Sequence, residues 1–174
     1  LLCQEVNKMS PPHGMCGPAA PAPAGGNAAA AATPAAKAAD AERVEALLGD
    51  GVDPNTTQAD GATALHWAAY HDDVAMAHAL LSATADAGVA NEFGATPLWL
   101  AAQNGSATMV KRLLEASADP NAVLASGETV LMMAARTGSS EAVRLLVEHG
   151  AAIDETEHTR GQTAVSYTHL TLPT

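Results

Sequence analysis

The sequence predicts an all-α solenoid, in which short antiparallel helix pairs stack in a row and are joined by extended turn loops. Three observations support this fold class. Sequence motifs return at intervals of about 33 residues over more than 100 residues. Each interval carries an apolar helical stripe that is too small to form a core without its neighbours. The chain is 48% hydrophobic but only 3% aromatic, so alanine and leucine must supply a closely packed core.

The clearest repeated motif is a Gly-x-Thr-x-Leu segment. It begins at Gly61, Gly94 and Gly127, in steps of 33 residues, and a partial copy begins at Gly161 after a step of 34. A pair of leucines and a segment of the Asp-Pro-Asn type repeat in phase with it. The leucine pairs begin at Leu47, Leu80, Leu113 and Leu145. Three motifs in phase over this length indicate true internal repeats.

The first helix of each unit is expected to begin just after the motif threonine, whose hydroxyl can cap the first turn. Pro97 suits that first turn, where a backbone donor has no partner within the helix. Leu65, Leu98 and Leu131 then face the core, and pairs of alanines allow the two helices of a unit to approach closely.

The second helix of each unit shows apolar residues at helical spacing, which predicts a buried stripe. In the last two complete units the expected stripes are Val110, Leu113 and Leu114, and Val143, Leu146 and Val147.

Glycines are expected to end the second helices, and their replacements predict local strain. Gly51 and Gly150 suit the left-handed conformation at a helix end. Thr84 and Ser117 stand at the same position in the middle units, so we expect backbone strain in these two turns. Gly88 stands where the other units have asparagine.

Together these motifs resemble the ankyrin repeat, whose signature is G-x-T-P-L-H-x-A-A, followed by a leucine pair and G-A-D-x-N. The resemblance covers residues 28–164. It implies a degenerate first repeat at about 28–58 and complete repeats two, three and four at about 59–91, 92–124 and 125–158, followed by a truncated fifth.

The domain organisation follows from these repeats and from composition. Residues 1–36 are expected to form a disordered Ala/Pro/Gly-rich tail and linker, and residues 37–164 the repeat domain. The pattern breaks at Val165. Back-translated, Val165–Thr174 resembles a transposase-end sequencing adapter, so we interpret it as non-native and expect the gene to continue as repeat five. The alternative is a natural but atypical C-terminal cap.

The resemblance implies that a partner binds at the turn tips and at the concave face of the first helices. Residues at these positions differ in chemistry between repeats, whereas the framework stays fixed. Phe93 and Tyr70 are the expected anchors, since aromatic residues dominate many interfaces. The predicted partner-binding residues are Ala59, Asp60, Ala62, Tyr70, His71, Glu92, Phe93, Ala95, Gln103, Asn104, Ala125, Ser126, Glu128, Arg136 and Thr137.

Two tryptophans and three histidines need separate interpretation. Trp67 occupies a leucine-type framework position and is expected in the core. Trp99 occupies the position of the usual histidine, where it could pack between repeats or line the groove. His66 matches the histidine that the resemblance implies to be structural, bonding between neighbouring repeats. It does not share one helix face with His71 and His78, so no metal site is expected.

Motifs and charge narrow the function classes. The chain has no G-x-S-x-G, phosphate-loop or H-E-x-x-H motif, so we expect no enzyme activity, cofactor or small-molecule substrate. Residues 40–164 carry 18 acidic and 6 basic residues, which disfavours nucleic acid and is compatible with a basic protein partner. No apolar run is long enough to span a membrane.

Two functional hypotheses follow. In the first, the array is a protein-binding module or scaffold. In the second, it is the recognition or regulatory arm of a longer enzyme or effector whose catalytic part is missing from this fragment. The sequence of the motif at Asp60–Asp73 looks like that of bacterial ankyrin proteins, many of which are exported. This resemblance favours the periplasm over the cytoplasm as the location, with the cytoplasm as the alternative.

Overall fold

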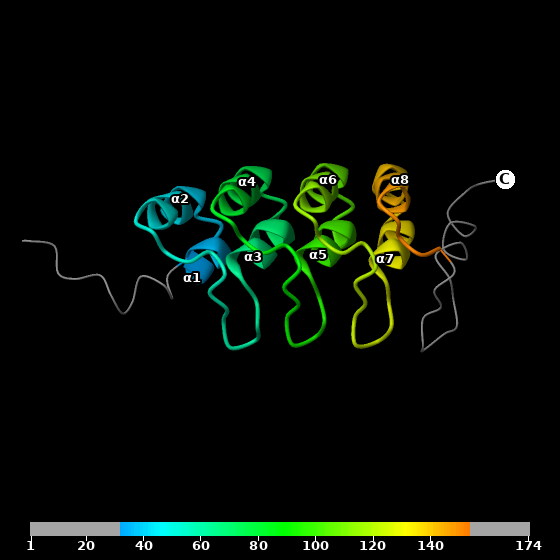
Figure 1. The fold of residues 1–174 in the computed structure, drawn as a ribbon, viewed down its shortest axis with the longest axis horizontal. Coiled ribbons are helices and arrows are strands. Elements are labelled where there is room, and N and C mark those ends of the chain that lie inside the picture. The colour runs from blue at the N-terminus through cyan, green and yellow to red at the C-terminus, as the bar shows by residue number, and fades with distance from the viewer. Residues whose placement is uncertain (1–31, 154–174) are drawn as a thin grey trace, which may run out of the picture.

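The computed structural model describes residues 32–153, and the eight helices in this range lie in two parallel rows (Figure 1). The first helices of successive repeats form one row: α1 (Ala32–Lys37), α3 (Ala64–His71), α5 (Pro97–Gln103) and α7 (Val130–Thr137). The second helices form the other row: α2 (Ala41–Gly49), α4 (Val74–Ser82), α6 (Ala107–Glu115) and α8 (Ser140–Glu148).

Each helix packs against its partner in the same repeat and against the corresponding helix of the next repeat. The three motif leucines, Leu65, Leu98 and Leu131, are buried between the rows, together with the alanine pairs that follow them. The prediction of an all-α solenoid of stacked antiparallel helix pairs is therefore confirmed.

Threonines precede three of the first helices, α3, α5 and α7, and they act in two different ways. In α5 and α7 the hydroxyls of Thr96 and Thr129 accept hydrogen bonds from backbone N–H groups of the first turn, at 3.3 Å and 3.2 Å. The predicted cap is confirmed there. At α3 the hydroxyl of Thr63 instead lies 2.9 Å from Nδ1 of His66.

The turns after the second helices use the left-handed conformation, as predicted. Gly51 and Gly150 have φ of +81° and +89°, which glycine adopts without steric cost. Thr84 and Ser117 hold the same conformation, with φ of +65° and +66°. Because a β-branched residue at positive φ is disfavoured, Thr84 is a site of local strain.

The predicted boundary between linker and domain needs correction. Residues 32–36, assigned to a disordered linker, belong to helix α1, in which Ala32, Thr33, Ala35 and Ala36 are buried. The hydroxyl of Thr33 donates a hydrogen bond to the carbonyl of Thr56 at 2.9 Å. Alanines can bury a helix face because they allow α1 to lie close against α3, and a proline in the first turn leaves that helix intact.

One predicted stripe also needs correction. In α8 the buried residues are Ala142, Leu145 and Leu146, whereas Val143 is half-buried and Val147 is 40% exposed. Leu114, at the position in α6 that corresponds to Val147, is buried because α8 packs against α6. Within residues 32–153 no further helix follows α8 to cover Val147.

Several predicted features lie outside the described residues. These are most of the tail before α1, the truncated fifth repeat and the interpreted adapter Val165–Thr174.

Candidate protein-binding surface

The extended turns project to one side of the first helices (Figure 1), and main-chain hydrogen bonds join them to one another. The N–H of Glu92 donates to the carbonyl of Asp60 at 3.0 Å, and the N–H of Ala125 donates to the carbonyl of Phe93 at 3.3 Å. Gly94 has φ +80°, and a Cβ there would lie 3.1 Å from the nitrogen of Ala125. These turns therefore form a well-supported base for the side chains at their tips.

Most of the predicted partner-binding residues lie at the surface, and Asp60 is partly exposed. The two expected anchors are strongly exposed, Phe93 at 67% and Tyr70 at 55%. The exposed members of the set are Ala59, Tyr70, His71, Glu92, Phe93, Gln103, Asn104, Ala125, Ser126, Arg136 and Thr137.

Three of the predicted binding residues are buried and need correction. Ala62, Ala95 and Glu128 are only 5%, 6% and 8% exposed. They lie between a turn glycine and the threonine that begins the next helix, where the chain enters the packed row of helices. The carboxylate of Glu128 pairs with Nη1 of Arg136 at 2.7 Å, so its charge is used within its own repeat.

Three other predicted residues join successive repeats, a role that was not anticipated. His71, Asn104 and Thr137 are spaced by 33 residues, and each bonds to a main-chain carbonyl at the end of the preceding first helix. The bonds run from His71 Nε2 to Lys37 O at 3.1 Å, from Asn104 Nδ2 to Ala69 O and Tyr70 O at 2.9 Å each, and from Thr137 Oγ1 to Ala102 O at 3.2 Å. The side chain of the residue before each of them, Tyr70, Gln103 or Arg136, makes no inter-repeat hydrogen bond in the described structure and is better placed for a partner.

His66 joins repeats two and three, as the resemblance implied. Its Nδ1 accepts from the N–H of Thr63 at 3.1 Å, and its Nε2 lies 3.1 Å from the carbonyl of Ala95. These partners assign the proton to Nε2 of a neutral ring. Burial lowers the pKa of His66, and the bond to Ala95 and the charge of Asp60 only partly oppose this.

Trp67 packs against the core, as the sequence predicted, but it is only half-buried. Its ring contacts that of Tyr70, with the ring centroids 5.8 Å apart in an edge-to-face arrangement. Nζ of Lys37 lies 5.0 Å from the Trp67 ring centroid. Trp99 is half-buried and packs against the core. Within residues 32–153 the indole N–H groups of both tryptophans have no hydrogen-bond partner.

A hollow of about 280 Å³ opens beside Trp67, between repeats two and three. Sequence reasoning named some of its residues but did not bring them together, because they come from the turn before α3, from α3 itself and from the following repeat. The lining residues are Asp60, Ala62, His66, Trp67, Tyr70, Asn91 and Leu100.

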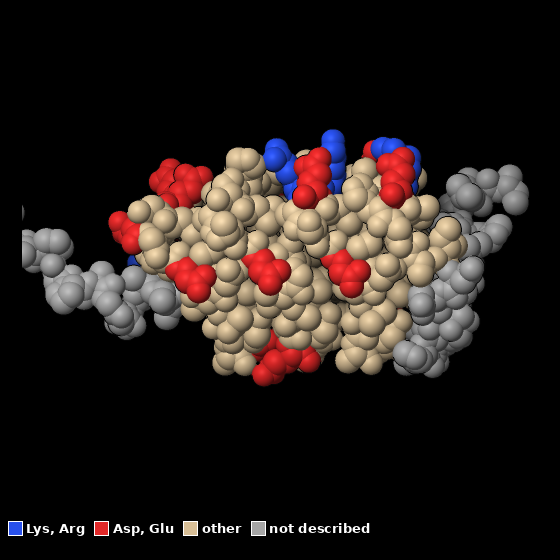
Figure 2. Space-filling model, in the orientation of Figure 1, with Lys and Arg blue, Asp and Glu red and all other residues tan. Residues whose placement is uncertain are grey.

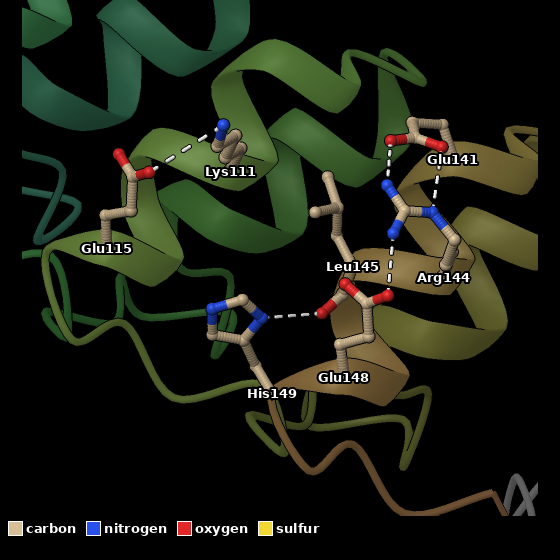
Figure 3. A network of polar contacts seen from close by, with 7 residues as sticks. All are labelled: Lys111, Glu115, Glu141, Arg144, Leu145, Glu148 and His149. Atoms are coloured by element: carbon tan, nitrogen blue, oxygen red, sulfur yellow. Dashed lines mark hydrogen bonds and ion pairs between the residues drawn. The ribbon is translucent and has the colours of Figure 1, made fainter.

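The second helices carry a network of exposed ion pairs, shown in Figure 3. Arg144 bonds to Glu141 and, through Nη1, to Glu148 at 2.6 Å, and Nζ of Lys111 lies 4.0 Å from Glu115. Hydrogen bonds to these carboxylates raise the pKa of Arg144, and the bond to Arg144 lowers the pKa of Glu141. Exposed pairs of this kind contribute little to stability.

Two further observations concern metals and membranes. In the described part of the chain, no group of three or more His, Cys, Asp or Glu residues is arranged to hold a metal ion. Among the helices of residues 32–153, none combines the length and apolar character needed to cross a membrane.

Comparison with known proteins assigns the family. A search of curated proteins gave no match. The family model for ankyrin repeats, described as three copies of the repeat, matches residues 33–124 and 117–170, which together make up most of the sequence. Ankyrin repeats are generally protein–protein interaction modules. The geometry and this match agree, and the chain belongs to the ankyrin-repeat family.

Proposed function

We propose that this ankyrin-repeat protein binds a protein partner non-covalently, through its turn tips and the exposed ends of its first helices. The observation that carries the proposal is the exposure of two aromatic side chains on this side of the molecule. Phe93 at a turn tip is 67% exposed, and Tyr70 near the end of α3 is 55% exposed. Aromatic residues lose little conformational freedom on binding and cover a large area, which suits them to anchor an interface.

The contrast between framework and surface supports the same function. Phe93 corresponds to Asp60 in repeat two and to Ser126 in repeat four. An apolar, an acidic and a hydroxyl side chain thus stand on the same kind of turn, each held by the main-chain bonds described above. A scaffold that keeps its backbone and varies its side chains suits specific recognition of a partner.

Site-specific photo-crosslinking tests the proposal. A photoreactive phenylalanine analogue is placed at position 93 or 70 in cells that produce the protein. The matched controls carry it at His78 on α4 or Lys111 on α6, which are also exposed but lie on the second helices. We expect positions 93 and 70 to capture the same protein and the controls not to. Equal capture at all four positions, or capture at the control positions alone, would contradict the proposal.

The alternative, that the array is the recognition arm of a longer enzyme or effector, uses the same surface. It differs only in what the repeats are joined to, and the crosslinking result applies equally to both.

A further inference from the structure

The hollow between repeats two and three is small. Its volume is about 280 Å³, whereas pockets for drug-sized ligands usually hold about 300–1,000 Å³. It lies between the turn before α3, helix α3 and the following repeat, and Asp60, Ala62 and Tyr70 of its lining are among the predicted partner-binding residues.

The walls of the hollow combine aromatic rings with one carboxylate. Trp67 and Tyr70 supply two rings in edge-to-face contact, and Asp60 supplies the charge. Asp60 Oδ1 accepts from the N–H of Ala62 at 3.0 Å, which fixes the carboxylate beside the rings. Among residues 32–153, Asp60 forms no ion pair with a basic side chain, so its charge is not neutralised there.

Apart from Lys37, which contacts the Trp67 ring, the charged residues in this part of the chain are acidic. Between Arg43 and Lys111 the chain has no lysine or arginine. His66, in the wall of the hollow, accepts a hydrogen bond from the N–H of Thr63 at Nδ1, and burial lowers its pKa, so the neutral ring is favoured. Figure 2 shows basic atoms gathered over α6 and α8, whereas the coloured charges along the turn-loop edge of this face are acidic. The acidic residues between Arg43 and Lys111 are Glu45, Asp50, Asp53, Asp60, Asp72, Asp73, Asp86 and Glu92.

The protein itself already places one cation against this tryptophan. Nζ of Lys37, from α1, lies 5.0 Å from the centroid of the Trp67 ring, within the range of a cation–π interaction. Lys37 comes from repeat one, and the hollow lies towards repeat three. The same indole can therefore attract a second cation from outside, where Asp60 adds an opposite charge.

We propose that this hollow receives a lysine or arginine side chain of the partner protein. The aliphatic stem of that side chain packs on Trp67 and Tyr70, and its charged end pairs with Asp60. This inference rests on the proposed function, because it names the chemistry by which the partner is recognised.

The test titrates the full chain with Nα-acetyl-arginine amide and follows the two indole N–H signals by NMR. The chain has two tryptophans, so Trp99→Phe assigns the signals. The control ligand is Nα-acetyl-citrulline amide, which has nearly the same shape and no charge. We expect a saturable shift of the Trp67 signal with the arginine compound, with a dissociation constant on the order of millimolar for a single side chain. We expect little shift with the citrulline compound.

A matched pair of variants locates the charge. Asp60→Asn removes the charge but keeps an oxygen that can accept from Ala62, and Glu92→Gln removes an exposed charge that does not line the hollow. A thermal melt of each variant checks its fold. We expect Asp60→Asn to weaken arginine binding about tenfold and Glu92→Gln to change it less than about twofold.

The outcomes separate this inference from the proposed function. If crosslinks form at positions 93 and 70 but the arginine compound shifts nothing at about 100 mM, well above the expected millimolar constant, the inference fails and the function stands. Equal shifts from both compounds, or equal losses in both variants, would likewise overturn the inference. If arginine binds as expected but no crosslinks form at positions 93 and 70, the hollow is a cation site and the proposed mode of partner binding fails.

Discussion

The side chains of two asparagines join neighbouring loops through a pair of hydrogen bonds each, here called an asparagine clamp, and repeat two has a glycine at the corresponding position. Nδ2 of Asn55 donates to the carbonyl of Thr84 at 3.3 Å, and Oδ1 accepts from the N–H of Asp86 at 2.7 Å. Asn121 makes the same two bonds in a later repeat, to Gly150 O at 3.1 Å and from the N–H of Ala152 at 2.8 Å. Each clamp thus joins the loop of one repeat to the loop of the next.

Gly88 stands at the corresponding position of repeat two and has no side chain to make this clamp. We predict that Gly88→Asn stabilises the protein, by bonding to the carbonyl of Ser117 and the N–H of Asp119. A Cβ at position 88 would lie 3.3 Å from Oδ1 of Asp86. The same turn at Asn55 and Asn121 accommodates a Cβ, since each donates its N–H at 2.9 Å to an aspartate two residues earlier.

The expected gain is about 1–2 kcal/mol in the free energy of unfolding. Losing the freedom of glycine in the unfolded chain contributes about 0.4–1 kcal/mol, and two exposed hydrogen bonds contribute about 0.5 kcal/mol each. Urea unfolding followed by circular dichroism measures the change. Gly88→Ala is the matched control, and we expect it to show only the glycine contribution. If Gly88→Asn is no more stable than Gly88→Ala, the clamp does not stabilise the array and the reasoning is wrong.

Two further predictions concern strain and protonation. Thr84→Gly should raise the free energy of unfolding by about 0.5–1 kcal/mol, because Thr84 is held at φ +65°. Thermal unfolding of Thr84→Gly, with Thr84→Ala as the control, measures this change. A loss of stability in Thr84→Gly would show that Thr84 is not strained. His66 should make the fold sensitive to acid, because burial lowers its folded pKa below the ordinary 6.5, so the folded state binds fewer protons than the unfolded state. Its contribution is complete above pH 6.5 and is lost as the pH falls below that value, with a slope of at most about 1.4 kcal/mol per pH unit. Urea unfolding from pH 7.5 to 5 should show a steeper loss for the natural protein than for His66→Gln, and equal slopes would contradict the assignment.

The repeat pattern was sufficient to predict the framework of the fold. The 33-residue phase placed Leu65, Leu98 and Leu131 in the core, and it identified Thr96 and Thr129 as helix caps. These features depend on local spacing, which a single sequence displays directly.

The binding surface was harder to predict, because it depends on contacts between repeats. Trp67 and Leu100, at the same position of successive repeats, are both half-buried, whereas Met133 at that position is buried, so the motif alone does not fix the burial there. His71 and Asn104 are exposed polar residues whose bonds to the preceding repeat have no sequence signature. Helix α1 was missed because its alanines and Pro34 have the same composition as a linker.

The most direct test of the account is the affinity of the crosslinked partner for surface variants of this protein. Phe93→Ser removes an anchor that is 67% exposed, so it should leave the fold unchanged. Calorimetric titration should show at least about tenfold weaker binding for Phe93→Ser, and Lys111→Ser on the second helices should bind within about twofold of the natural protein. Unchanged affinity for Phe93→Ser, together with a large loss for Lys111→Ser, would place the binding surface on the opposite row of helices and contradict the account.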